Sequence, residues 1–470
     1  MRSRHYVRAL CAVTAALCLT APQASATGQP PPSPKPVESL VDKPVPGSVA
    51  LQRFAGRMGD LARRNGMSES LLTSVLRTDR TSWIDQDARL FYVDDAVPGA
   101  MRGADSPAKI QPAQLAADVF ALHSHPGADR VIYLDFDGYL LTGTAWNVSK
   151  NLDPVDITPW DTDGDPSTFS AAERAVVQEV WQRVAEDYAP FDVDVTTEDP
   201  GAAAINRSGV ADNVYGTRIV VDPTDWYQAG CACGGVAYVG SFDDTDNGSH
   251  QPGFAFTLGL GNGAKSIAEA ASHEAGHTLG LTHDGTADVK YYGGQGSWAP
   301  IMGVGYNKAI TQWSKGEYAG ANNAQDDFAV MTQSGVTYRP DDHGNSTATA
   351  TALTVGTTAD GVIAAGGDAD YFVVALPAGS HTITAAPAAV GADLDIKMTL
   401  LNGAGAVLGT YDPASGQSSA STATGLGAAT TWNLAGGTYY VRIEGTGYAD
   451  PLTTGYSAYG SRGAFTLRAS

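Results

Sequence analysis

The chain has 470 residues, with 50 acidic and 29 basic side chains and a formal net charge of −21. A chain of this length predicts roughly two to four domains. The acidic balance argues against nucleic acid and anionic membrane as partners, and we expect a soluble monomer.

Residues 1–26 have the pattern of a signal peptide. Arg2, Arg4 and Arg8 form a basic start, and the apolar stretch that follows, 9–19, is too short to span a membrane. The sequence Ala24-Ser25-Ala26 then offers a cleavage site. No later segment is long and apolar enough for a membrane helix. We therefore expect a secreted, extracellular protein.

Residues 27–128 form a second region, which begins as a proline-rich extended leader. Phe54, Met58 and Leu61 recur at helical spacing and predict a helix that Asn65-Gly66 ends. Ser68 begins a second predicted helix, and the stretch 83–93 has strand-like character. The region is therefore predicted to be small and mainly helical.

A third region, 129–340, alternates predicted strands and helices. Strands are expected at 130–138, 191–197 and 218–222, and the capping box Ser170 to Glu173 opens a long helix. Asp161, Asp163 and Asp165 alternate around a glycine, which suits calcium, although a solvated acidic turn explains them equally well. Cys231 and Cys233 are either bridged to each other or free thiols.

The sequence from His273 to His283, H-E-A-G-H-T-L-G-L-T-H, carries the strongest chemical signal. Histidines four apart share a helix face, so His273 and His277 can converge on one zinc ion. Gly280 can end the helix in a left-handed conformation and bring back His283 as a third ligand. Three neutral ligands leave a position for water, and Glu274 is placed to take its proton. A capping box from Ser266 to Glu269 predicts where this helix begins.

This pattern resembles the metzincin zinc proteases, in particular reprolysin-like members, whose motif is followed by a methionine turn. The resemblance implies that Met302 lies beneath the metal and that Asp284 is a hydrogen-bond partner rather than a ligand. Tyr306 is a candidate metal contact, although it follows the methionine later than in that pattern. Residues 234–242 resemble the edge strand on which substrate backbone adds, or they form an ordinary buried strand.

In a secreted protease, 27–128 would act as a prosegment that keeps the enzyme latent. Because it contains no cysteine, a thiolate cannot block the zinc. His123 and His125 could plug the metal instead, or they could lie in an exposed linker.

Past Pro340 the composition changes to Gly, Ala, Thr and Ser with short alternating strands. Residues 341–470 resemble the bacterial pre-peptidase C-terminal domain, a β-sandwich that is often removed on maturation. Motifs such as Gly367-Asp-Ala-Asp-Tyr-Phe372 and Gly437-Thr-Tyr-Tyr-Val-Arg-Ile443 carry this resemblance.

The sequence thus predicts an α/β (α+β) metzincin-like domain, with a mixed twisted sheet and an active-site helix, followed by an all-β sandwich. The predicted function is a zymogen of a zinc endopeptidase that acts on extracellular proteins and peptides. Two alternatives stay open: a surface-binding or adhesion protein, and a zinc amidase acting on cell-wall peptides.

Overall fold

A computed structural model describes residues 41–96, 114–227, 233–245 and 247–470. The predicted signal peptide, most of the proline-rich leader and Cys231 lie outside the described residues. Within the described part of the chain, no helix is both long and apolar enough to span a bilayer.

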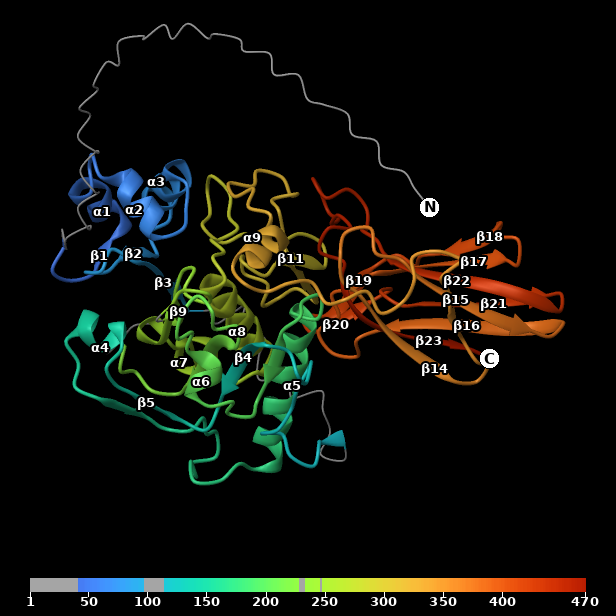
Figure 1. Cartoon of the computed structure of the whole chain (residues 1–470), viewed down its shortest axis with the longest axis horizontal. Helices are drawn as coiled ribbons and strands as arrows, with labels where there is room; N and C mark the ends of the chain where they lie inside the picture. The colour runs from blue at the N-terminus through green and yellow to red at the C-terminus, as the bar shows by residue number, and fades with distance from the viewer. Residues whose placement is uncertain (1–40, 97–113, 228–232, 246) are drawn as a thin grey trace, which may run out of the picture. The chain divides into compact units, whose positions relative to one another are not determined.

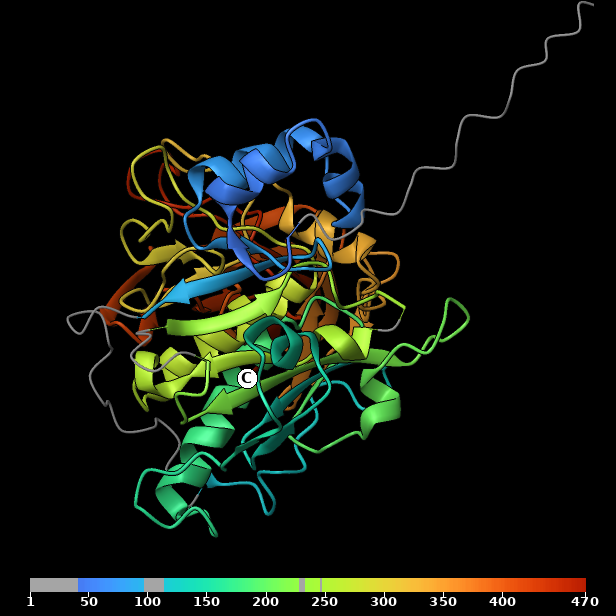
Figure 2. The ribbon, with the colours of Figure 1, turned by 90° about the vertical axis from the view of Figure 1, so that its left-hand side faces the viewer.

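The N-terminal described segment, 41–95, combines three short helices with three strands (blue in Figures 1 and 2). Ser68 caps the third helix by accepting the Leu71 N–H at 3.2 Å, as predicted. The single helix predicted through Phe54 and Met58 is instead two helices, because Gly56 adopts a φ of 78° between them. The elements are β1 (Val45–Pro46), α1 (Gly47–Arg53), α2 (Met58–Arg64), α3 (Glu69–Thr78), β2 (Ser82–Ile84) and β3 (Leu90–Asp95).

An eight-stranded mixed sheet runs through the segment and the region after it, in the order β1-β2-β3-β9-β10-β8-β4-β7. One half is parallel, with β7, β4, β8 and β10 aligned, and the other half, from β9 to β1, is antiparallel. The predicted mixed sheet is therefore present. Its remaining strands are β4 (Arg130–Asp135), β7 (Asp194–Thr196), β8 (Tyr215–Asp222), β9 (Cys233–Tyr238) and β10 (Gly253–Phe256).

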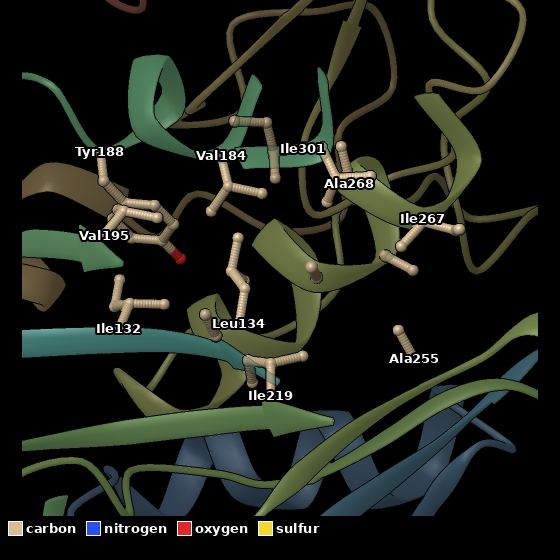
Figure 3. Packing of buried hydrophobic residues seen from close by; sticks show 14 of the residues in the cluster. Ile132, Leu134, Val184, Tyr188, Val195, Ile219, Ala255, Ile267, Ala268 and Ile301 are labelled. Atoms are coloured by element: carbon tan, nitrogen blue, oxygen red, sulfur yellow. The ribbon is translucent and has the colours of Figure 1, made fainter. Parts of the chain in front are cut away.

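Two long helices, α5 (Ala171–Asp187) and α8 (Ala264–Thr278), pack against this sheet. The predicted capping box is present at α5, where Ser170 and Glu173 exchange side-chain and backbone hydrogen bonds. Figure 3 shows sheet residues such as Ile132 and Ile219 pointing into the same core as Val184 and Ile267 of the helices. The Tyr188 hydroxyl donates to the Ser272 carbonyl at 2.9 Å and ties α5 to α8.

Shorter elements complete this region around the sheet. They are β5 (Tyr139–Leu141), α4 (Ala145–Lys150), β6 (Val155–Ile157), α6 (Ala202–Ile205), η2 (Asn247–His250), α7 (Thr257–Leu260), β11 (Trp298–Pro300), β12 (Ile310–Gln312) and α9 (Asp327–Gln333).

The C-terminal region is all-β, as predicted, and builds two main sheets. A five-stranded sheet has the order β13-β15-β22-β17-β18, and a four-stranded sheet has the order β14-β23-β16-β21. Alternate residues of both sheets enter one apolar core, for example Phe372 and Val441 from one and Ile383 and Leu467 from the other. The strands are β13 (Thr351–Ala352), β14 (Thr358–Ile363), β15 (Asp370–Leu376), β16 (Gly379–Pro387), β17 (Ile396–Asn402), β18 (Val407–Tyr411), β19 (Gly416–Ser419), β20 (Thr422–Thr424), β21 (Ala428–Leu434), β22 (Gly437–Gly445) and β23 (Gly463–Ala469).

Candidate metal centre

Helix α8 carries two of the three histidines, His273 and His277, one turn apart on the same face. The helix begins earlier than predicted, with Gly263 at its N-cap and no side-chain cap. The predicted capping box is therefore wrong: Ser266 and Glu269 lie inside the helix, and Glu269 instead pairs with Lys265 one turn before it. Small residues along α8 allow it to be buried over nearly its whole length, so packing rather than capping fixes its start.

The chain reverses directly after α8 at Gly280, whose φ is 96°, in the left-handed region that the sequence predicted. The turn returns His283 to the other two imidazoles. The Nε2 atoms of His277 and His283 lie 3.0 Å apart. The centroid of the His273 ring lies 4.7 Å from the centroid of the His277 ring and 5.1 Å from that of the His283 ring. The structure thus brings the three predicted ligands together.

Each imidazole is oriented through its Nδ1 atom. The Ile301 carbonyl accepts from His273 at 2.9 Å, and the Leu281 carbonyl accepts from His277 at 2.8 Å. His283 is held by the Asp79 carboxylate at 2.5 Å, on the C-cap of α3. The Asp284 carboxylate, predicted to be a hydrogen-bond partner rather than a ligand, interacts with Ser314 and Asn323 and lies outside the metal cluster. Nδ1 partners of this kind leave Nε2 free to bind a metal.

A fourth side chain, Asp94 of β3, lies among the three histidines and was not found from the sequence. Its Oδ2 is 3.2 Å from the His273 Nε2 and 3.5 Å from the His277 Nε2, and its Oδ1 is 3.1 Å from the His283 Nε2. Burial acts to raise the pKa of Asp94, but the contacts with the histidines hold it well below the usual range. A single aspartate 179 residues before His273 has no spacing signal that could have identified it.

The geometry suits a metal ion. One ligand atom from each of Asp94, His273, His277 and His283 can be chosen so that all four lie within 4.8 Å of one another. The His273 Nε2 and the Asp94 Oδ2 are buried and have no hydrogen bond, although they are close together. Buried polar atoms without partners are rare, and three imidazole nitrogens plus a carboxylate oxygen form a zinc-like donor set.

Glu274 lies next to the cluster and is 1% exposed. Burial and then the charge of Asp94 raise the pKa of its carboxyl well above the ordinary value. Gly235 of β9 makes room for it, because a Cβ there would lie 2.0 Å from the Glu274 Oε1. A cavity of about 470 Å³ opens beside Glu274, His273 and Asp94. A substrate carbonyl in this cavity would be next to both the histidines and a carboxyl base.

Met302 and Tyr306 lie close to the helix but differ in position. Met302 is fully buried beneath α8, where a Cβ on Gly276 would be 2.8 Å from its sulfur. Its carbonyl accepts the Asp284 N–H at 2.8 Å, which ties the methionine loop to the chain after His283. Tyr306 lines the cavity with Glu274, and a metal role for it stays a prediction.

His123 and His125 do not reach the metal centre. His123 bonds Asp194 at 2.6 Å and Glu198 at 2.8 Å, and His125 lies 3.1 Å from Asp192. The hypothesis that either histidine plugs the metal is therefore wrong. Both rings are held instead by carboxylates in and beside β7, which lies next to this stretch of chain.

The predicted calcium turn is rearranged. Glu173, rather than Asp165, groups with Asp161 and Asp163. Asp161 accepts backbone N–H groups from residues 163 to 165, and Asp165 accepts from Ser167 and Thr168, as in solvated turns. Calcium binding here stays a prediction.

Two further features concern cysteine and acidic side chains. Cys233, at the start of β9, is disulfide-bonded and so is not a free thiol, while Cys231 lies outside the described residues. In the C-terminal region, Asp341, Asp368 and Asp370 place carboxylate oxygens within 4.8 Å of one another. This second acidic group was not found from the sequence.

Comparison with known proteins agrees with this site. Residues 202–284 match the model of the reprolysin-like metallo-peptidase family M12B. This stretch contains the three histidines and Glu274, and it confirms the predicted resemblance. The chain therefore contains a metallopeptidase-like segment. No curated protein matches the chain significantly.

Solved structures give weaker similarities. The chain resembles the pre-peptidase C-terminal domain of a collagenase from Bacillus anthracis, with 14% identity over 28% of this chain and 100% of that one, and a TM-score of 0.19. A periplasmic inhibitor of g-type lysozyme from Aeromonas hydrophila has 14% identity over 26% and 96%, with a TM-score of 0.16. CorA, a surface-associated copper-binding protein of Methylomicrobium album BG8, has 10% identity over 26% and 98%, with a TM-score of 0.17. Values this low carry no functional argument.

Proposed function

We propose that the protein is a secreted zinc-dependent endopeptidase that hydrolyses peptide bonds of extracellular proteins. The observation that carries the proposal is the convergence of His273, His277 and His283 beside the buried Glu274. The family match over the same residues supports a peptidase. In this proposal the three histidines hold zinc, and the apolar Met302 forms the floor beneath them.

The chemistry follows from where the side chains lie. A bound zinc supplies Lewis-acid polarisation of the scissile carbonyl and lowers the pKa of a water. Glu274 takes a proton from the attacking water and passes it to the leaving amine. Burial raises the pKa of the Glu274 carboxyl, which favours its holding the proton between the two transfers. Extended substrate would pair with β9, where Gly234 lets a backbone approach closely, since a Cβ there would lie 2.8 Å from the Asp95 carbonyl oxygen of β3.

Replacing Glu274 tests this function. We expect the Glu274→Ala variant to retain one zinc per chain by elemental analysis but to lose casein cleavage by about 10³-fold or more. Both proteins are processed by the same added protease, so that failure of self-processing cannot imitate failure of catalysis. Glu198→Gln, an exposed carboxylate away from the cluster, is the control and should cleave normally. Retained peptidase activity in Glu274→Ala would overturn the assignment.

A further inference from the structure

Strand β3 of the N-terminal segment occupies the side of β9 that a substrate would need. The two strands are antiparallel, with Tyr92 opposite Ala237, Val93 opposite Val236 and Asp94 opposite Gly235. In the described sheet, only β3, β2 and β1 lie beyond β9 on this side. Without residues 41–95, β9 would become the edge strand, with backbone groups free to pair with a peptide.

The ladder between β3 and β9 is irregular at the metal centre. The register shifts between Asp94 and Asp95, so that Asp95 pairs with Cys233. Such a bulge re-aims the side chains on either side of it. Asp94 points to the histidines, whereas Asp95 lies 2.6 Å from the Lys290 ammonium and is half exposed. The shift thus separates two neighbouring aspartates into a buried one and a surface one.

Other side chains hold Asp94 in place. The Tyr291 hydroxyl donates to the Asp94 Oδ1 at 2.9 Å. Tyr92, two residues before it on β3, stacks on the His277 ring at 4.4 Å and approaches the His283 ring at 4.1 Å. Asp79, also in the N-terminal segment, bonds the His283 ring. The segment therefore contacts the His277 and His283 rings through Tyr92 and Asp79. Its Asp94 carboxylate faces all three.

We propose that Asp94 is the fourth zinc ligand of the full-length chain and occupies the position that the catalytic water needs. Strand β3 covers the substrate edge of β9 at the same time, so the N-terminal segment blocks both the metal and the peptide site. This inference rests on the proposed function, since it assigns a ligand and a mode of latency to the same centre. Residues 27–128 contain no cysteine, so no thiolate of this segment can block the metal. In this proposal the Asp94 carboxylate blocks it instead.

Cobalt substitution of the full-length protein tests this without measuring activity. Cobalt(II) reports its ligands by visible absorption, and acetohydroxamate, a small metal-binding probe, reports an open position. We expect the wild-type spectrum to be insensitive to the probe. Asp94→Ala and the size-conserving Asp94→Asn should have altered spectra that change again when the probe is added. Release of the metal to a chelator should become about tenfold faster in both variants.

Asp95→Asn is the matched control, since Asp95 is the adjacent residue of β3 and contacts lysine rather than histidine. It should behave as wild type. Near-UV circular dichroism shows whether each variant is folded. The inference would be overturned if the Asp94 variants had the same spectra and probe responses as wild type. In that case, loss of cobalt in His277→Ala would still support the proposed metal centre. A wild-type chain that binds no stoichiometric metal would overturn both.

Discussion

Two buried carboxylates connect the region around the mixed sheet and its helices to the neighbouring parts of the chain, and they differ in charge. Asp94 reaches from the N-terminal segment to three imidazoles, and its pKa lies well below the usual range. Glu186, on α5, accepts the Ala464 N–H of the C-terminal sandwich at 3.2 Å, and burial raises its pKa to about 8. Both side chains are desolvated, so the partner and not the burial decides which carboxyl stays ionised.

The difference teaches how each contact responds to its surroundings. Cationic or metal-binding partners keep the Asp94 carboxylate anionic, which a ligand requires. At Glu186 the partners are mainly backbone N–H groups, which carry no full positive charge. The buried carboxyl group is therefore more stable when it is protonated. The Asp94 contact therefore depends on the imidazoles that face it, and the Glu186 contact depends on pH.

Replacing His283, the charged partner of Asp94, should have the largest effect on the free energy of unfolding. In the metal-free chain, burial lowers the pKa of His283 but the facing Asp79 and Asp94 raise it to about 9, so the ring is charged at neutral pH. His283→Ala removes the charged ring that these two buried carboxylates share and should lower the free energy of unfolding by about 3 kcal/mol or more. Urea denaturation at pH 7 in chelator measures this. His343→Ala, in the C-terminal region, is the control; an equal loss there would contradict the comparison.

The Glu186 contact predicts a pH dependence. Because its folded pKa of about 8 exceeds the ordinary value of 4.5, the folded state binds the proton more tightly than the unfolded state. Its contribution to stability is complete below about pH 4.5, is lost as the pH rises to 8, and stays lost above that. Glu186→Gln should raise the free energy of unfolding at pH 9 by about 2 kcal/mol and leave it little changed at pH 4. Denaturation at both values checks this, and an equal effect at both would refute it.

Of the three substitutions, the one at Asp79 should change the free energy of unfolding least. Asp79→Asn weakens the hydrogen bond to the His283 Nδ1 and removes its charge, and we expect a loss of about 1 kcal/mol in metal-free unfolding experiments. The outward-facing Asp87→Asn, on the loop before β3, is the control. A loss as large as that of His283→Ala would mean that Asp79, rather than Asp94, carries most of the charge pairing.

The three histidines, Glu274 and the turn at Gly280 could be predicted because they lie within 11 consecutive residues with helical spacing. The mixed sheet and the later all-β region followed from alternation and composition. Asp94 and Asp79 could not be predicted, since their place depends on pairing between β3 and β9, about 140 residues apart. The start of α8 was misplaced because a local capping signal at Ser266 was overridden by burial of the helix.

The pairing of β3 with β9 has a consequence for solubility. If residues 41–95 were removed, β9 would present an unpaired row of N–H and C=O groups, and its residues include the apolar Val236 and Tyr238. An unpaired edge of this kind would be a template for other chains as well as for substrate. By pairing with β9, strand β3 therefore covers backbone groups that could otherwise pair with another chain, so the strand proposed to block the site would also limit self-association.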